Sequence, residues 1–315
     1  MGGLIAPILT LIMVMGLASA PRAAAFEPQE VWSDKEIIVK SKLGGPVMWK
    51  IKKGDSTVWV LGVLPDLPRS QKWDKKRISR AIKGANELIL PPQIAVGIGD
   101  FFKAMSAKNL PKPQTLQSVV SPNIYARYTE LSQKTGVPIK AFEHDKPVWA
   151  GVRFRADVLK KLKLNEHEPQ DSVVSLATSE GVAIKKSAVY HLAPLMKDLN
   201  NMSLENSQAC LSYTLDDIDY AMNRGQIAAQ AWANGDLKTV RANYIGSNLS
   251  SCLEGSEKGS AFLDRSVDDT VGAIQEALTH SGKTVAIFSL ASLLRKDGAL
   301  DRLRAKGYEI TNPEP

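Results

Sequence analysis

The sequence is poor in the side chains that most often bind metals or act as nucleophiles. Of its 315 residues, only two are cysteine and four are histidine. Neither cysteine has a second cysteine or a histidine at zinc-finger spacing, so a structural zinc site is not expected. The chain also lacks a Gly-x-Ser-x-Gly segment. This absence argues against the turn that exposes a serine nucleophile in α/β-hydrolases.

The chain also lacks an apolar run long enough to cross a bilayer as a helix. Its longest run, Leu4–Leu17, covers roughly 14 residues, and a transmembrane helix needs roughly 20. Small residues follow at 18–20 and 23–25, as at signal-peptide cleavage sites. We therefore expect residues 1–25 to be a signal peptide, cut at its end because Pro21 hinders the earlier cut. The alternative is an uncleaved anchor, since only the amino terminus supplies positive charge before the run.

The charge balance is mildly basic, at +7 for the full chain. Cleavage after residue 25 would remove one base, Arg22, and no acid, which leaves +6. Basic residues cluster at 72–80 and at 160–163, in stretches that could be helical. Such runs are usually solvated helix faces, and export would separate the chain from nucleic acid. No nucleic-acid partner is expected, and attraction to anionic polysaccharide or lipid headgroups is left open.

The expected export makes a disulfide between the two cysteines possible. An oxidising compartment permits structural disulfides that the cytosol does not. We expect a bond between Cys210 and Cys252, which would constrain the unfolded chain by about 4 kcal/mol in the loop-entropy description. The alternative is a pair of free, buried thiols.

Both ends of the mature chain alternate between strand and helix patterns. At the amino-terminal end, β-branched and aromatic residues predict two strands around a Gly-Asp turn, then an amphipathic helix and a third strand. At the carboxyl-terminal end, the pattern predicts helix, strand, helix and a short strand, with the second helix broken or starting near Gly298. The expected ranges in chain order are 47–52, 57–63, 73–85, 87–90, 266–279, 283–289, 293–306 and 308–311.

The middle of the chain, about residues 100–260, has a mostly helical pattern divided by prolines. We therefore expect an α/β fold, with a mixed central sheet formed by the N- and C-terminal segments and a helical insert between them. Residues 26–45 would be an N-terminal linker, and 46–312 the folded domain. A 44% share of hydrophobic residues is enough to build a sizeable core.

Motifs at both ends of the folded region point to a known family. These motifs are Val47–Gly54 followed by Thr57–Gly62, Gly235–Leu237 after Ala231-Trp232, and Gly298–Tyr308. The chain resembles the TraB/GumN family, which is related to the Tiki peptidases and to erythromycin-esterase and ChaN-like proteins. The resemblance covers nearly the whole mature chain. It implies descent from metal-dependent hydrolases.

The residues that would hold the family's metal are replaced. In active relatives, two Gly-x-x-His pairs and a glutamate that ends the third strand are thought to bind a divalent cation that activates water. Here the first pair reads Gly62-Val63-Leu64-Pro65, and the second reads Ser289-Leu290-Ala291-Ser292. Pro91 follows the strand where the glutamate would stand. The resemblance thus implies a vestigial site, with positions Gly62, Pro65, Asp66, Pro91, Ser289 and Ser292.

Other titratable residues offer weaker candidates for a site. Asp66 could hold a cation or act as a base, although a turn role between Pro65 and Pro68 is the simpler interpretation. The triplets 143–145 and 166–168 each place histidine between carboxylates. Neighbouring side chains diverge on a helix or strand, so one triplet alone chelates poorly. His191 and His280 are expected to be polar surface residues or satisfied boundary residues.

Together these observations predict an exported TraB/GumN-like protein that binds or interacts without catalysis, in the periplasm or secreted. No catalytic residue, metal or cofactor is expected. The alternative is an active peptidase or esterase that uses manganese or cobalt with replacement ligands such as Asp66, Glu143 or His144. The partner is left open among an envelope protein, a peptide and a polysaccharide.

Overall fold

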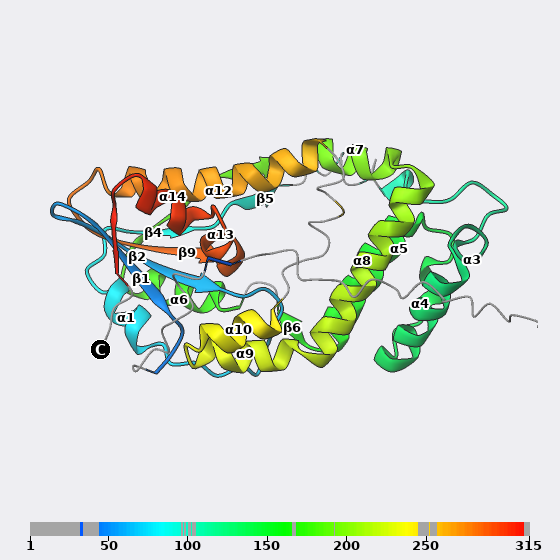
Figure 1. Ribbon diagram of the computed structural model, residues 1–315, viewed down its shortest axis with the longest axis horizontal. Helices are drawn as coiled ribbons and strands as arrows, with labels where there is room; N and C mark the ends of the chain where they lie inside the picture. Colours follow the sequence, from blue (N-terminus) through cyan, green and yellow to red (C-terminus); the bar gives the residue numbers. More distant parts are fainter. Residues whose placement is uncertain are drawn as a thin grey trace, which may run out of the picture.

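The computed structural model describes residues 32–33, 44–95, 97, 99, 102, 105–165, 168–191, 193–244, 252 and 257–311. The expected signal peptide and most of the expected linker lie outside these residues. An α/β body occupies one end of the molecule and a helical arm the other (Figure 1). Among the helices of the described part, none combines the length and apolarity that a membrane span requires.

A mixed six-stranded sheet forms the centre of the body, with strand order β10-β1-β2-β9-β4-β7. Strand β1 is antiparallel to both of its neighbours, whereas β2, β9, β4 and β7 run parallel to one another. In chain order the strands are β1 (Met48–Lys53), β2 (Ser56–Val63), β4 (Glu87–Leu90), β7 (Ala183–Lys186), β9 (Gly282–Ser289) and β10 (Glu309–Thr311). Two small sheets pair β3 (Leu67–Pro68) with β6 (Leu164–Asn165), and β5 (Gln93–Ala95) with β8 (Val189–His191).

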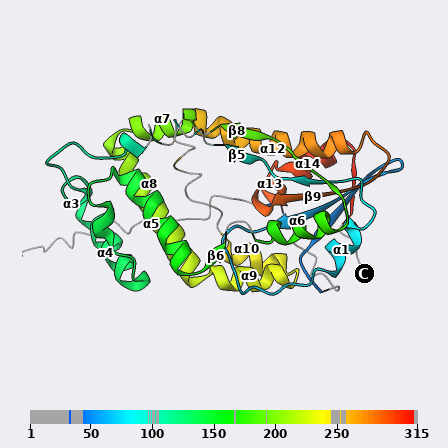
Figure 2. The same ribbon diagram turned by 180° about the vertical axis from the view of Figure 1, so that it is seen from behind.

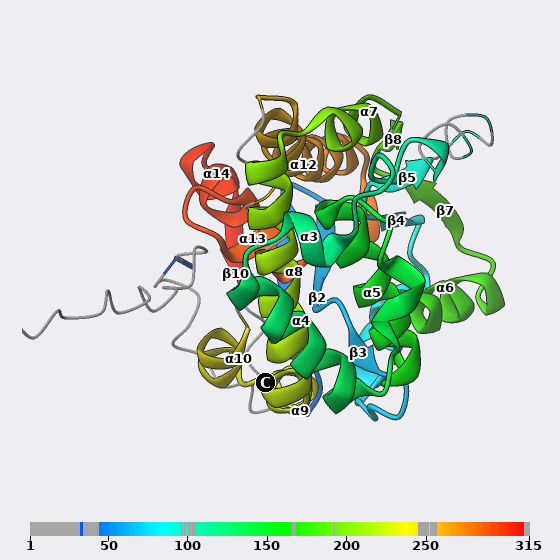
Figure 3. The same ribbon diagram turned by 90° about the vertical axis from the view of Figure 1, so that its right-hand side faces the viewer.

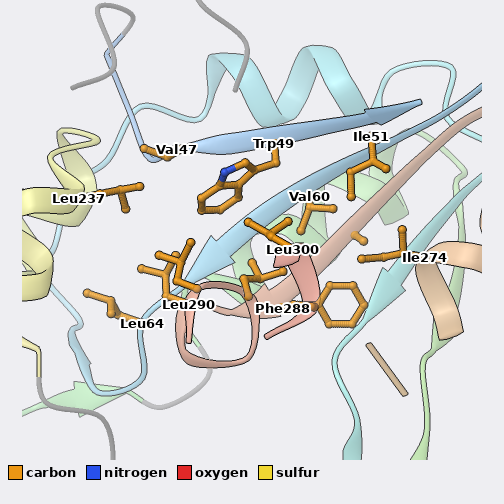
Figure 4. Packing of buried hydrophobic residues seen from close by; sticks show 14 of the residues in the cluster. Val47, Trp49, Ile51, Val60, Leu64, Leu237, Ile274, Phe288, Leu290 and Leu300 are labelled. Carbon is orange, nitrogen blue, oxygen red and sulfur yellow. The ribbon is translucent and has the colours of Figure 1, made fainter. Parts of the chain in front are cut away.

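The first face of the sheet carries the larger apolar core. Trp49 and Ile51 of β1 point into it and are completely buried. Helices cover this face, and Figure 4 shows Leu290 and Leu300 packed beneath the Trp49 ring. These helices are α9 (Gly225–Ala233), α10 (Leu237–Asn243), α12 (Glu257–Ala277), α13 (Leu290–Leu294) and α14 (Ala299–Ala305).

The second face is covered by α1 (Lys76–Ile82) and α6 (Gln170–Ser179), which Figure 2 shows from their own side. Met48, the neighbour of Trp49 on β1, points to this face because successive side chains of a strand alternate. Val285 and Ile287 of β9 also pack here, while Ala286 and Phe288 face the first core. Strand β9 is therefore buried on both faces, as expected of a central parallel strand.

The helical arm has a core of its own. Helices α5 and α8 pack along each other and bury Phe154, Leu211 and Leu215. Figure 3 shows α3 and α4 on the outer side of this pair. The arm consists of α3 (Leu116–Val119), α4 (Pro122–Thr135), a 3-10 turn (Ile139–Phe142), α5 (Pro147–Lys161), α7 (Ala193–Asn201) and α8 (Leu204–Asn223).

The predicted α/β fold class is confirmed, with two differences in detail. The sheet includes β7 from the middle of the chain, which the sequence pattern did not reveal. The helix expected at 293–306, broken or starting near Gly298, is two helices on either side of that glycine, and the first of them begins earlier than expected, at Leu290. A side chain at Gly298 would come within 2.6 Å of the Arg295 carbonyl oxygen and 2.9 Å of that of Ser292, so the chain turns where only glycine fits.

Cys210 and Cys252 lie at disulfide-bonding distance, with their Cα atoms 5.0 Å apart and a separation of 42 positions in sequence. Cys210 is on α8, and Cys252 precedes α12. Both are buried against Val148 and Trp149 of α5. The pair therefore links the helical arm to the chain segment that returns to the body.

Candidate functional site

The positions that the resemblance predicts to be a vestigial site lie at one edge of the sheet. Strands β2, β9 and β4 are parallel neighbours, so their carboxyl ends meet at the same edge. Val63 at the end of β2 lies opposite Ser289 at the end of β9. Pro91 directly follows β4. In open α/β sheets this carboxyl edge is where ligands bind.

Gly62 has a packing role at this edge. A side-chain carbon there would lie 2.3 Å from Leu290 Cδ2 and 2.8 Å from Trp49 Cζ3. The Gly62 carbonyl oxygen also accepts a 2.8 Å hydrogen bond from Trp232 Nε1 of α9. The packing of the core therefore leaves no room for a side chain at Gly62, and a helix that covers the sheet holds its backbone in place.

The two serines of the second motif cap a helix. Ser289 is the N-cap of α13, and its Oγ accepts a 3.0 Å hydrogen bond from the Ser292 amide. Ser289 Oγ also donates to Ser292 Oγ at 2.9 Å. A side-chain oxygen that satisfies the first amides of a helix is a usual N-cap arrangement.

Asp66 forms an ion pair across the gap between body and arm. It lies in the turn between β2 and β3, with a left-handed backbone at a φ of 57° that Asp tolerates better than most residues. Its Oδ2 accepts a hydrogen bond from the Arg155 guanidinium of α5. The sequence pointed to Asp66, but it gave no sign of Arg155, which lies 89 residues away.

A cavity of about 280 Å³ opens beside Asp66, between the end of β2 and helices α5, α8 and α9. Charged or polar side chains on its wall are Asp66, Arg155, Asp217 and Tyr220. The rest of its wall is mostly apolar and is formed by Leu64, Pro65, Leu67, Ala221, Gly225, Ala228 and Tyr244.

Two residues of α8 add buried polar groups to the wall of this cavity. Asp217 is 8% exposed, and Tyr220 follows it by three residues on the same helix face. The Tyr220 hydroxyl is buried and has no hydrogen-bond partner in the described part of the chain. Burial raises the pKa of Tyr220 above its usual range, so the phenol stays protonated. Sequence reasoning missed both residues because they fall within an ordinary helical pattern.

The acidic triplet at 143–145 lies elsewhere, at the start of α5 in the helical arm. Asp145 is 2% exposed and forms ion pairs with Arg153 and, at 2.5 Å, with Lys108. His144 is exposed. The eight residues from the start of α5 to Arg155 span about 12 Å of helix, so the triplet is not brought to the Asp66 cavity.

The remaining histidine candidates do not join the site either. His191 and His280 are both exposed, as expected. His167, with Glu166, lies outside the described residues. Within the part of the chain that is described, no three or more His, Cys, Asp or Glu side chains gather closely enough to hold a metal ion.

A family model described as "TraB/PrgY/gumN family" matches residues 47–312, which spans all six strands of the central sheet. No curated protein matches the chain, and no solved structure does.

Proposed function

The chain belongs to the TraB/PrgY/gumN family, and from this premise we propose that it is an exported, non-catalytic member that binds a ligand or partner at the carboxyl edge of its sheet. Such a protein would keep the scaffold of a metal-dependent hydrolase without its chemistry. The partner would be an envelope protein, a peptide or a polysaccharide.

The observation that carries this proposal is the set of side chains at the edge. The side chains of Pro65 and Pro91 offer no lone pair, and Ser289 and Ser292 are engaged in capping α13. A catalytic divalent site generally needs about three protein ligands and an open position for water. A neutral hydroxyl is a poor substitute for imidazole. The residues present therefore do not fit the metal that the family resemblance implies.

The neighbouring carboxylates do not repair this loss. Asp66 is paired with Arg155, and a guanidinium beside a carboxylate competes with a cation for the same oxygens. Glu143 and His144 lie in the arm, at the far end of α5. These placements weigh against the alternative of an active manganese- or cobalt-dependent peptidase or esterase with replacement ligands.

Export is the second part of the proposal. It is supported by the apolar run at 4–17 with its small residues and by the cysteine pair at bonding distance, since disulfides persist in oxidising compartments. On this basis the mature protein would be periplasmic or secreted.

The test is a turnover assay of the purified mature protein. A peptide library and a panel of ester substrates would be incubated with manganese or cobalt and analysed by mass spectrometry. A family member that carries both Gly-x-x-His pairs serves as the positive control. We expect products from the control and none from this chain. Metal-dependent products that disappear in Asp66→Asn would establish the alternative.

A further inference from the structure

We propose that a basic surface on the second face of the sheet adsorbs to the headgroups of an anionic lipid bilayer. This inference goes beyond the proposed function and does not depend on it, because the surface shares no residue with the vestigial positions or with the cavity beside Asp66. The basic surface combines helix α1, the two residues that flank it, and the neighbouring strand β1. Its side chains are Lys50, Lys52, Lys75, Lys76, Arg80 and Lys83.

The outward side of α1 carries the first three of these charges. The residues that the helix buries in the core of the second face are Ile78, Ala81 and Ile82. At 3.6 residues per turn, the positions on the opposite side are Lys76, Arg80 and Lys83. All three are exposed. A partner that approaches α1 from outside therefore meets three positive charges along one ridge.

Strand β1 adds positive charge beside the end of α1. Across the sheet, Lys52 pairs with Thr57, and Thr57 pairs with Lys283 of β9. Neighbouring strands are about 4.8 Å apart, so the backbones of Lys52 and Lys283 are roughly 10 Å apart. The Lys283 ammonium donates hydrogen bonds to the carbonyl oxygens of Arg80 at 3.3 Å and Lys83 at 2.5 Å. The exposed Lys52 side chain thus lies on the same side of the molecule as the outward ridge of α1.

The charges of the basic surface are not balanced by ion pairs. Within the described part of the chain, none of its six cations has a carboxylate at ion-pair distance. Burial and the nearby Lys52 ammonium lower the pKa of Lys50 below its usual value. Like charges held close together disfavour the charged form, and an approaching anion relieves this repulsion. The surface therefore favours a partner that carries many negative charges.

The contacts of the aromatic rings favour lipid headgroups over a sugar chain. The Lys50 ammonium lies 5.2 Å from the centroid of the Trp59 ring, and that of Lys75 lies 5.3 Å from the centroid of the Trp73 ring. Each ring thus already has a cation over one face, where a sugar could otherwise stack. Among the described residues, the large apolar side chains that are exposed lie on neither α1 nor β1.

This lack of exposed apolar side chains also sets the depth of the contact. Helices that insert into the boundary between headgroups and acyl chains need an apolar face for it. The outward ridge of α1 has only cations. Lys and Arg near an anionic leaflet are attracted by its negative surface potential. The adsorption would therefore be electrostatic, without insertion, and sensitive to salt.

The experiment is co-sedimentation of the mature protein with lipid vesicles. One set contains phosphatidylglycerol mixed with phosphatidylcholine, and the other contains phosphatidylcholine alone. We expect binding to the mixed vesicles only, weakened by about tenfold or more when the salt concentration is raised from low to physiological. Equal binding to both sets, or binding to neither, would overturn the proposal. Binding to soluble polygalacturonate without binding to the mixed vesicles would also overturn it, in favour of an acidic polysaccharide.

Variants locate the adsorption. The triple variant that combines Lys76→Gln, Arg80→Gln and Lys83→Gln should bind the mixed vesicles on the order of a hundredfold more weakly, since each cation near the bilayer contributes about fivefold. Lys52→Gln alone should weaken binding about fivefold for the same reason. Circular dichroism would verify that each variant is folded. Unchanged binding in a folded triple variant contradicts the proposal.

A matched control removes the same net charge from the helical arm. It combines Lys140→Gln, Lys160→Gln and Lys161→Gln, three exposed residues that lie on neither α1 nor β1. We expect the control to bind the mixed vesicles within about threefold of the wild-type protein, because charges beyond the screening length of salt contribute little. Equal losses in the two triple variants would show that net charge, and not the basic surface, drives the adsorption, and would overturn the proposal.

Discussion

The α/β body and the helical arm are held together in different ways. The body packs large apolar residues such as Trp49 and Phe288 between a sheet and its covering helices. The arm adds to its smaller core a buried carboxylate, Asp145, with two cations, and a cysteine pair. The candidate cavity lies where these two regions meet. Its shape thus depends on an apolar edge from one region and on charged helices from the other.

The largest loss of stability is expected in the body. Trp49→Ala should lower the free energy of unfolding by about 3–5 kcal/mol, because a fully buried aromatic leaves a cavity that the sheet cannot close. Urea unfolding followed by circular dichroism measures it. Trp59→Ala is the control. Because Trp59 is partly exposed, its replacement should lower the free energy of unfolding by less. Equal losses in both variants would contradict a core centred on Trp49.

The cysteine pair provides the second comparison, because it links the arm to the segment that leads back to the body. Replacing both residues, as Cys210→Ser with Cys252→Ser, should lower the free energy of unfolding by about 2–4 kcal/mol. The reason is that the unfolded chain gains conformational entropy when the cross-link is removed. The same urea experiment, run with and without reductant, checks this. The double variant should be insensitive to reductant. If reductant also left the unfolding of the wild-type protein unchanged, the disulfide would not be formed in solution.

A smaller effect is expected for the buried charge of the arm. Asp145→Asn keeps the size of the side chain but leaves Lys108 and Arg153 facing each other. Both cations reach solvent in part, so we expect a loss of about 2 kcal/mol, below the range for fully buried pairs. Glu130→Gln, which removes an exposed pair with Lys134, is the control and should leave the unfolding midpoint unchanged.

The smallest effect concerns the edge of the body itself. Ser289→Ala removes the cap of α13 and should cost about 1 kcal/mol. The reason is that the Ser292 amide would lose the hydrogen bond that it donates to Ser289 Oγ. Thermal unfolding followed by circular dichroism measures the effect. An unchanged unfolding midpoint would contradict the capping role of Ser289.

The strands of the body could be predicted because their residues carry local signals. The Gly-Asp turn marks the β1–β2 hairpin, and the apolar run of β9 marks a central strand. Strand β7 escaped prediction because all four of its residues are exposed, so it shows no apolar alternation. The family motifs located the edge of the sheet. The ion pair and the cavity at this edge could not be predicted, because Asp66 and Arg155 are far apart in sequence and come into contact only in the folded structure.

The most direct test of the central claim is the metal content of the mature protein after incubation with manganese or cobalt and dialysis. Elemental analysis gives moles of metal per mole of protein, with a family member that carries both Gly-x-x-His pairs as reference. If the metal ligands at the carboxyl edge of the sheet are replaced, the ratio of metal to protein should be far below one for this chain and near one for the reference. A stoichiometric metal that is lost in Asp66→Asn would contradict the account.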